Sequence, residues 1–239
     1  MKIAVSGATG RMGKLIIEAV INSDDLKLIA AVTAPGVAEI GTDAGASLGK
    51  TTGVMITDDV QELAKADVLI DFTRPQATLA YLPFCVKHNV GVVIGTTGFD
   101  AQGKVQIAEA AKTVPVVFAP NMSVGVNSVL KLLEIASAML SQYDCEIVEM
   151  HHKHKVDAPS GTALEMGRRV ALGRGVDFDS VAVLSREGHT GERPDGAIGF
   201  AALRGGDVVG DHTVIFAGPG ERIEISHKSG SRAGYAQGA

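Results

Sequence analysis

The chain has 239 residues, 46% of them hydrophobic and 21% charged, which is enough for a sizeable core in one large domain or two small ones. Its net charge of −5 and its lack of a long basic run argue against a nucleic acid as partner. With 29 glycines, no tryptophan and 4% aromatic residues, the composition is typical of an α/β enzyme rich in glycine turns, not of an all-β or coiled-coil protein.

The cysteines and the amino end of the chain bear on its compartment. Cys85 and Cys145 lie far apart in apolar runs, so we expect buried thiols and neither a disulfide framework nor a structural zinc site. Met1 and Lys2 lead directly into an apolar, strand-like segment, which leaves no room for a signal peptide. No apolar run has the length that a bilayer-spanning helix requires. These features predict a soluble, cytoplasmic protein without a membrane partner.

The chain begins with a strand, a glycine turn and a helix. Residues 2–6 are apolar, glycines follow at positions 7, 10 and 13, and residues 14–21 have helical spacing. Gly7 permits a tight turn, Gly10 lets the backbone approach a pyrophosphate, and Gly13 lets the helix pack closely on the strand. The phosphate is then expected to rest on the helix N-terminus. The pattern predicts a dinucleotide site, and a plain tight turn is the alternative.

A second strand at 26–32 ends just before Thr33 and Ala34. In dinucleotide folds this position carries the residue that meets the adenosine ribose, usually Asp or Glu for NAD, with an Arg nearby for NADP. Neither signal is present here. The sequence therefore leaves the choice between NADH and NADPH open.

Strands alternate with helices through the first half of the chain. After a long Gly-rich loop at 35–53, we expect strands at 54–56, 67–72, 90–94 and 114–118, and helices at 59–64, 75–88 and 101–112. This alternation is typical of a Rossmann-type parallel sheet with right-handed crossovers. Residues 95–97 and Asn121 then fall at the carboxyl ends of strands, where such sheets bind their ligands.

The pattern changes after Asn121. We expect helices at 124–140 and 160–172 around a strand at 145–150, and then strands at 181–184, 197–203, 213–217 and 222–227. No helix separates the last three strands, and short turns between adjacent strands indicate antiparallel pairing. The sequence thus predicts an α/β protein whose second, α+β domain carries an open, largely antiparallel sheet.

The segment 149–163, EMHHKHKVDAPSGTA, concentrates the polar chemistry of the chain. Three histidines and two lysines occupy positions 151–155, and after Pro159 the residues Ser160, Gly161 and Thr162 open a helical run. Imidazoles, fixed cations and a helix N-terminus suit the binding of an anionic small molecule and the delivery of a proton to it. A solvated basic loop before a capped helix is the alternative interpretation.

Seven segments, spread over essentially the whole chain, carry a resemblance to one family. In chain order they are VSGATGRMG from Val5, DFTRP from Asp71, VIGTTGF from Val93, APNMSVGVN from Ala119, the segment 149–163, SREGHTGER from Ser185 and RGGDVVGDH from Arg204. The chain resembles the 4-hydroxy-tetrahydrodipicolinate reductases, also called dihydrodipicolinate reductases, of bacterial lysine and diaminopimelate biosynthesis. The pattern HHxxKxDxPSGTA is a very specific signature, so the resemblance outweighs the basic-loop alternative.

The resemblance implies a reaction and a domain plan. The reaction is the reduction of 4-hydroxy-tetrahydrodipicolinate to tetrahydrodipicolinate with NADPH or NADH. Residues 1–122, with 229–239, are implied to form the dinucleotide-binding domain, and 123–228 the substrate-binding and oligomerisation domain. An open sheet is commonly covered by symmetric assembly, and a homotetramer is implied. Relatives usually continue with a further helix beyond 234–239, which leaves open whether this sequence is truncated or naturally short.

The resemblance also implies site residues, with no metal among the ligands. His151 is implied to be the proton donor and acceptor, and Lys155 the second acid. The substrate, a small cyclic dicarboxylate, is implied to be held by His152, Ser160, Gly161 and Thr162. The residues implied to bind the nicotinamide cofactor are Gly7, Ala8, Thr9, Gly10, Arg11, Met12, Thr33, Gly95, Thr96, Thr97, Ala119, Pro120, Asn121 and Met122. Members that strongly prefer NADPH tend to carry a basic residue at the position of Ala34, so this departure keeps the preference open.

Two functions of other classes are alternatives. A zinc hydrolase built on His151, His152 and His154 is disfavoured, because neighbouring strand residues point to opposite faces and no Asp, Glu or Cys completes a familiar ligand spacing. A nucleotide-sensing regulator without catalysis is disfavoured because His151, Lys155 and the glycine turn are retained. The sequence does not decide whether the site or only the loops of the open sheet involve His189, Arg193 and His212.

Overall fold

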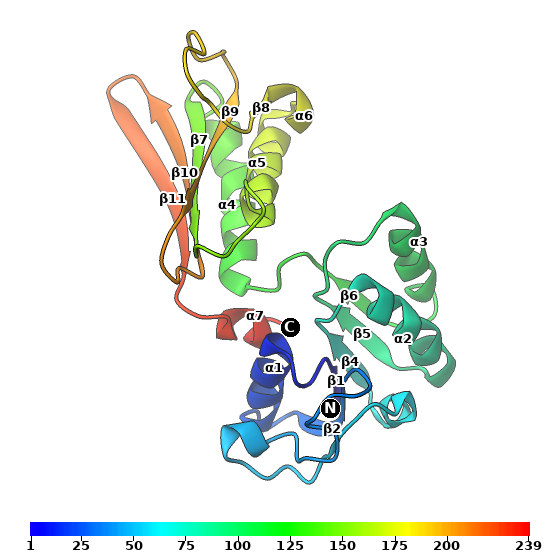
Figure 1. Cartoon of the computed structure of the whole chain (residues 1–239). Helices are drawn as coiled ribbons and strands as arrows, with labels where there is room; N and C mark the ends of the chain where they lie inside the picture. Colours follow the sequence, from blue (N-terminus) through cyan, green and yellow to red (C-terminus); the bar gives the residue numbers. More distant parts are fainter. The chain divides into compact units, whose positions relative to one another are not determined.

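The computed structural model describes residues 1–239, and the chain divides into two units. One unit comprises residues 1–123 and 233–239, and the other comprises residues 124–232. Figure 1 shows the elements of both, coloured along the chain. The chain returns to the first unit at Ala233 rather than at the predicted residue 229, because the last strand of the second unit continues to Ser229. The functional roles of the two units stay predictions.

A six-stranded parallel sheet forms the centre of the first unit. Its order is β3-β2-β1-β4-β5-β6, and every pair of neighbours is parallel, which confirms the predicted Rossmann-type sheet. The strands are β1 (Lys2–Ser6), β2 (Lys27–Val32), β3 (Ile56–Thr57), β4 (Val68–Asp71), β5 (Gly91–Ile94) and β6 (Val116–Phe118). Strand order reverses at β1, since β2 and β4 flank it, and sheets of this type bind ligands at such a switch point.

Helices cover both faces of this sheet. They are α1 (Arg11–Ile21), α2 (Pro75–His88), α3 (Ala101–Ala110) and α7 (Ala233–Gln237), with short helices η1 (Ala46–Leu48) and η2 (Val60–Lys65). Ala4 and Leu69 pack with α2 and α3 on one face, while Ile3 and Val5 pack with α1 and α7 on the other (Figure 1). Because both faces are buried, the strands read as nearly continuous apolar runs. The helix expected at 59–64 is a 3-10 helix, η2, whose short length disfavours α-helical geometry.

The second unit is a five-stranded sheet with helices on one face. Its order is β11-β10-β7-β9-β8. The strands are β7 (Asp144–His151), β8 (Ala182–Val183), β9 (Ile198–Arg204), β10 (Gly210–Gly218) and β11 (Glu221–Ser229). The helices are α4 (Val124–Met139), α5 (Gly161–Arg174) and α6 (Phe178–Val181). Leu133 of α4 and Met166 of α5 pack on Ile147 and Phe216 of the sheet, and α4 and α5 lie side by side (Figure 1).

This second sheet is mixed. β10 pairs antiparallel with β7 and with β11, so the antiparallel prediction is correct for the last two strands. β9 does not pair with β10 as expected from their short connection; it pairs parallel with β7, and β8 pairs parallel with β9. The chain passes from β7 to β9 through α5, and a helical crossover makes the strands that it joins parallel. The strand expected at 181–184 is shorter, because α6 extends to Val181.

No helix of this structure combines the length and the apolar character that crossing a membrane requires.

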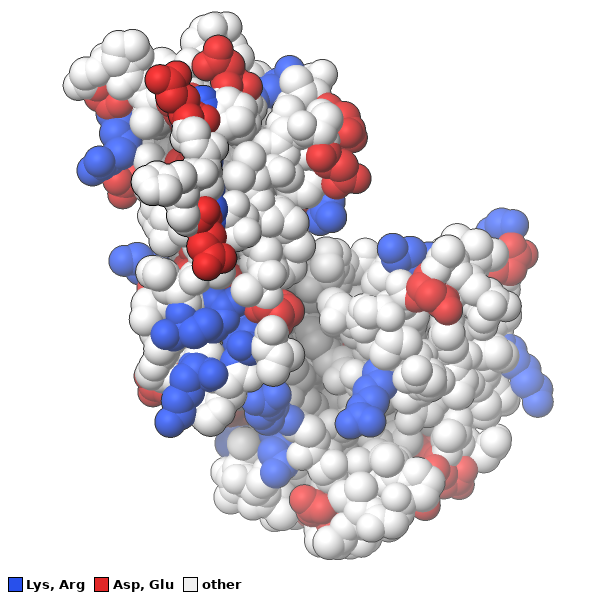
Figure 2. Space-filling view, turned by 45° about the horizontal axis from the view of Figure 1, so that its top comes forward, with Lys and Arg blue, Asp and Glu red and all other residues white.

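Both kinds of charged side chain lie on the surface of the molecule. Figure 2 shows Lys and Arg side chains at several places on the face that it draws, among Asp and Glu side chains; the chain as a whole carries a net charge of −5.

Candidate active site

The predicted glycine turn lies between β1 and α1. Gly7 has φ +62°, a left-handed backbone that favours glycine. A Cβ on Gly13 would lie 2.1 Å from the carbonyl oxygen of Gly7, so α1 packs on the turn only with glycine there. Gly10 precedes α1 with an extended backbone, and no side chain caps the helix. The first N–H groups of α1 therefore have no side-chain acceptor, which suits a phosphate group.

The end of β2 lies beside this turn. The hydroxyl oxygens of Thr9 and Thr33 are 2.9 Å apart, and the Ala8 N–H donates to the carbonyl oxygen of Val32 at 3.1 Å. Thr33 is buried, whereas Ala34 and Arg11 are exposed. Thr33 thus ties β2 to the turn, and the end of β2 offers a ribose neither a carboxylate nor a guanidinium.

A buried carboxylate, which the sequence analysis missed, joins the ends of three strands. Asp71 at the end of β4 is fully buried and accepts from Ser6 at 2.5 Å and from Thr73 at 2.6 Å. The hydroxyls of Thr78 and Thr96 also donate to it. Thr96, one of the predicted cofactor residues, is buried in this contact. In the sequence, Asp71 is an acidic residue inside an apolar strand and begins the segment DFTRP, but the sequence analysis assigned it no role.

The other predicted cofactor segments follow β5 and β6. A Cβ on Gly95 would lie 2.2 Å from the ring of Phe72, so only glycine fits there. The Ala119 N–H donates to the carbonyl oxygen of Ile94 at 3.3 Å, which joins these two segments. Met122 is buried. Because all six strands are parallel, the segments after β1, β5 and β6 share one edge of the sheet.

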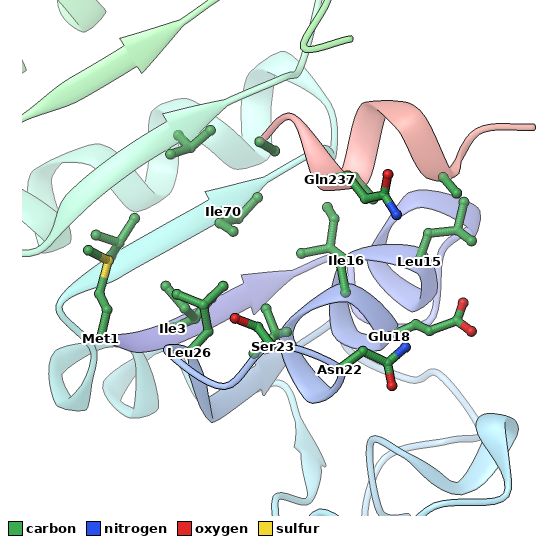
Figure 3. Close-up of a pocket in the computed structure, with 17 residues that line it drawn as sticks. Met1, Ile3, Leu15, Ile16, Glu18, Asn22, Ser23, Leu26, Ile70 and Gln237 are labelled. Carbon is green, nitrogen blue, oxygen red and sulfur yellow. The ribbon is translucent and has the colours of Figure 1, made fainter. Parts of the chain in front are cut away.

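A pocket of about 680 Å³ in the same unit is separate from these segments. Figure 3 shows it between α1, α7 and the sheet, with Ile16, Gln237 and Ile70 on its walls. Its lining is mostly apolar and includes Met1 and Ile3 at the amino end of β1. The cofactor segments lie at the opposite, carboxyl edge of the strands, so this pocket contains none of the predicted site residues.

In the second unit, a buried pair of a carboxylate and an imidazole lies at the end of β7. Every second residue of this strand is buried, namely Cys145, Ile147, Glu149 and His151. Glu149 is 1% exposed, and its Oε2 lies 2.6 Å from Nδ1 of His151. A buried carboxylate requires donors for its lone pairs, and an imidazole N–H is one of them. The predicted acid is thereby held by a residue that the sequence analysis missed.

Arg204 and the start of α5 supply further donors to Glu149. Both terminal nitrogens of Arg204 donate to the carboxylate at 2.8 Å, and the Ser160 N–H donates at 3.1 Å. Burial acts to raise the pKa of Glu149, but the hydrogen bonds from Arg204, His151 and Ser160 outweigh it and hold the pKa below its usual value. Glu149 is therefore an ionised, buried acceptor.

His212 completes this cluster. It lies opposite Glu149 in the antiparallel pair of β7 and β10, and its ring centroid is 5.0 Å from that of His151. Its Nε2 is 3.0 Å from Oγ of Ser160, and it is 4% exposed. Burial, reinforced by the positive charge of a protonated His151, lowers the pKa of His212 to about 4. His212 is thus a neutral imidazole at physiological pH.

The predicted second acid lies on the loop that follows β7. Lys155 Nζ donates to both carboxylate oxygens of Asp157, at 2.8 and 2.9 Å. This hydrogen bond holds the pKa of Asp157 below its usual value. Arg204, which already binds Glu149, also donates to the carbonyl oxygen of Asp157 at 2.7 Å. The loop is therefore attached to the same guanidinium as the buried pair.

The predicted substrate residues lie around this loop and the start of α5. Ser160 is the N-cap of α5, and its Oγ accepts from the Ala163 N–H at 3.2 Å. The His152 N–H donates to the carbonyl oxygen of Val208 at 2.8 Å. The pKa of His152 is lowered mainly by desolvation of the imidazole and, to a smaller extent, by the positive charge of Arg232. The structure therefore brings together six predicted residues: His151, His152, Lys155, Ser160, Gly161 and Thr162.

The three residues that the sequence left undecided have different surroundings. Arg193 donates to Glu146 at 2.9 Å, to Asp144 at 2.7 Å and to backbone carbonyls, so it holds a loop to β7. His189 is exposed. His212 lies in the buried cluster, as described above. No group of three or more His, Cys, Asp or Glu side chains is arranged to hold a metal ion.

Solved structures have the same fold. The chain is similar over its whole length to "Dipicolinate bound Dihydrodipicolinate reductase" from Paenisporosarcina sp. TG-14, with a TM-score of 0.77, 25% identity and 91% of that chain covered. A probable dehydrogenase from Thermotoga maritima, 15% identical, is similar in fold alone, with a TM-score of 0.61 over 100% of this chain and 85% of that one. A parallel sheet with a glycine turn at its switch point is the plan of a dinucleotide-binding fold, and the first unit of the chain belongs to this class.

Sequence comparisons define the family. Profiles described as "Dihydrodipicolinate reductase, N-terminus" and "Dihydrodipicolinate reductase, C-terminus" match residues 1–122 and 125–239. A 4-hydroxy-tetrahydrodipicolinate reductase from Cupriavidus metallidurans is 60% identical over 241 residues, which cover 100% of this chain and 91% of the relative. Another from Burkholderia multivorans is 59% identical with the same coverage. The chain belongs to the dihydrodipicolinate reductase family.

Proposed function

We propose that this chain reduces 4-hydroxy-tetrahydrodipicolinate to tetrahydrodipicolinate with a reduced nicotinamide cofactor, in lysine and diaminopimelate biosynthesis. The family relationship supports this reaction. The structural observation that carries the proposal is the buried pair of His151 and Glu149 beside the start of α5 and Lys155. Such an arrangement offers an acid–base group, a cation and anion-binding N–H groups within one unit.

The substrate class follows from the donors near α5. The relative from Paenisporosarcina sp. TG-14 is described with dipicolinate bound, which supports a small dicarboxylate as ligand. In this chain the carboxylates would accept from the N–H groups of Gly161 and Thr162 and from Lys155. A Cβ on Gly161 would meet no atom within 4 Å, so open space adjoins this helix end. A substrate carboxylate would compete with Asp157 for the Lys155 ammonium.

Proton delivery falls to His151 and Lys155. Loss of the 4-hydroxyl group as water, with a proton from the neighbouring ring carbon, would leave a conjugated imine. A nicotinamide, when bound, would supply the hydride that reduces this imine and adds electron density to the ring system. A protonated His151 and the Lys155 ammonium stabilise that density, and one of them delivers the proton. His152 lies on the same loop and contacts the substrate.

The cofactor is proposed to bind at the carboxyl edge of the first sheet. The glycine-only contacts at Gly13 and Gly95 and the uncapped start of α1 fit a dinucleotide. Thr33 carries no charge to repel a 2′-phosphate, and Ala34 offers no guanidinium to bind one. Both NADPH and NADH are therefore accepted, with a modest preference at most.

A homotetramer assembled through the second sheet is also proposed. β11 has a neighbouring strand on one side only, and most of its residues are exposed. Leu203 and Ile223 on this sheet are 49% and 39% exposed. An unpaired strand edge and exposed apolar side chains favour cover by further copies of the chain.

A coupled assay tests the reaction. The purified protein, mixed with the upstream synthase and its substrates, should oxidise reduced nicotinamide only when the synthase supplies the dicarboxylate. The loss of absorbance at the reduced-nicotinamide band measures turnover, and His151→Gln protein is the matched control. A folded protein that binds cofactor but shows no absorbance change would contradict the proposal and favour the nucleotide-sensing regulator.

A further inference from the structure

The carboxylate of Glu149 is held in one orientation by four donors. Oε2 accepts from Nδ1 of His151 at 2.6 Å and from Arg204 at 2.8 Å. Oε1 accepts from the other terminal nitrogen of Arg204 at 2.8 Å and from the Ser160 N–H at 3.1 Å. Arginine matches a carboxylate in this two-point geometry, whereas lysine offers a single point charge. The four lone-pair positions of the carboxylate are thereby filled.

This contact decides which nitrogen of His151 is available. An ionised carboxylate only accepts, so Nδ1 is the donor, and the neutral imidazole carries its proton on that nitrogen. Nε2 is left as the nitrogen that exchanges a proton. It faces Gly210, where a Cβ would lie 3.0 Å away. A glycine at this position therefore leaves room beside Nε2.

The same guanidinium reaches the second acid. Arg204 donates to the carbonyl oxygen of Asp157 at 2.7 Å, and the carboxylate of Asp157 accepts from Lys155 at 2.8 Å. Arg204 and His151 are register partners in the parallel pair of β7 and β9. The strand pairing thus brings the guanidinium beside both acids.

We propose that Glu149 is the positioning residue of His151, which it keeps in the Nδ1-protonated tautomer, and that Arg204 holds Glu149 and the Lys155 loop in one register. This proposal rests on the proposed reductase function, in which His151 handles the proton. A purely structural ion pair is the competing explanation. Replacement of a residue that hydrogen-bonds a functional histidine typically lowers activity by about 10–100-fold. This range comes from histidines that bind metal ions.

A double-mutant cycle separates the two explanations. Glu149→Gln should lower kcat by about 10–100-fold. The KM values for the dicarboxylate and for the cofactor should stay within about threefold of wild type. In a His151→Gln background the same change should cost less than about threefold, because residues that act as a unit are not additive. Arg204→Lys should lower kcat in the same way. If Glu149→Gln lowers kcat by the same factor in both backgrounds, Glu149 does not act through His151 and the proposal is wrong.

Glu146→Gln is the matched control. Glu146 lies on the same strand and also pairs with arginine, accepting from Arg186 at 2.8 Å and from Arg193 at 2.9 Å, but it does not contact His151. Its kcat should stay within about threefold of wild type. A loss equal to that of Glu149→Gln would show that any broken ion pair on β7 has this effect, and would overturn the proposal.

A measurement of the tautomer in the wild-type protein is independent of activity. Magic-angle-spinning NMR of protein labelled with ¹⁵N at histidine distinguishes the two neutral tautomers, and the signal that disappears in His151→Gln assigns the residue. Protonated Nδ1 and bare Nε2 are expected, and the opposite tautomer would overturn the proposal. If the assay finds no turnover, the reductase function fails, and the spectrum alone decides the positioning by Glu149.

Discussion

At the scale of single residues, the two proposed acids have different surroundings. His151 is buried and held by Glu149, whereas Lys155 lies on a loop and pairs with the more exposed Asp157. A buried imidazole with a fixed partner meets the substrate in one orientation, and a lysine on a loop exchanges one carboxylate partner for another. We therefore propose that both groups act in the chemical step and that cofactor binding falls to the other unit.

We expect His151→Gln and Lys155→Ala each to lower kcat by at least about 10²-fold, because a positioned acid typically contributes 10²–10⁴-fold. Affinity for the cofactor should be nearly unchanged, since its proposed ligands lie in the first unit. Steady-state kinetics and fluorescence titration of the reduced cofactor measure the two quantities. A His151→Gln protein within about threefold of wild type would refute the assigned role.

Arg11 is expected to carry what preference the protein has for NADPH. It is exposed at the start of α1, one residue after Gly10, and an exposed charged contact with a phosphate contributes roughly 1–2 kcal/mol. That energy corresponds to about a tenfold preference in kcat/KM. Arg11→Ala should remove it, measured with both cofactors at low and moderate salt. A wild-type ratio beyond about a hundred would show that another residue reads the 2′ position.

His212 should make the stability of the protein depend on pH. Its pKa is lowered to about 4 by burial and by the nearby His151, so between pH 6.5 and that value the unfolded chain binds more protons than the folded one. Stability therefore rises with pH across this window. Acidification from about pH 7 to about pH 5 should cost roughly 2 kcal/mol through this residue.

Urea unfolding of wild type and of His212→Asn at several pH values checks this expectation. The variant removes the titrating group, so its free energy of unfolding should fall less on acidification than that of wild type. Equal slopes for the two proteins would show that His212 does not carry the effect.

At the scale of elements, the strand–turn–helix unit of β1 and α1 depends on close backbone contact. Gly13 lies in the first turn of α1, where a Cβ would overlap the carbonyl oxygen of Gly7 at 2.1 Å. Backbone atoms cannot swing aside as a flexible side chain does. A larger residue must therefore move α1 away from the turn, and the proposed phosphate-binding N–H groups move with it.

Gly13→Ala is expected to weaken cofactor binding by at least tenfold or so and to lower the melting temperature, because the helix start is displaced from its strand. Titration with NADPH and thermal unfolding measure the two effects. Gly234→Ala is a suitable control, since a Cβ there would meet no atom within 4 Å. Unchanged binding by Gly13→Ala would show that the turn does not hold the cofactor.

At the scale of the whole molecule, the second sheet offers a surface for assembly. Its helices α4 and α5 cover one face, and β11 leaves an unpaired edge. Light scattering at micromolar concentration should report four copies of the 24.7 kDa chain. Replacement of Ile223 on β11 by Lys should shift the protein toward smaller species. A wild-type protein that stays monomeric contradicts the proposed assembly.

Much of the fold could be predicted from local patterns. The strand, glycine turn and helix at the start, the helix that begins at Pro75 and the parallel order of the first sheet all follow from residue spacing over short stretches. The pairing of β9 could not, because its short connection to β10 indicated a neighbour that the sheet does not provide. The packing of α5 across the sheet places β9 beside β7 rather than beside β10.

The sequence by itself determined the fold class, the family and the segment that carries His151 and Lys155, because these depend on residues close together in the chain. Glu149 already stood two residues before His151, on the same strand face. Only the tertiary structure brought in Arg204 and His212, which lie 55 residues from Glu149 and 52 residues from Ser160, their respective hydrogen-bond partners. The physical reason is strand register: the pairing of β7 with β9 and β10 sets which side chains meet, and no local pattern encodes that register.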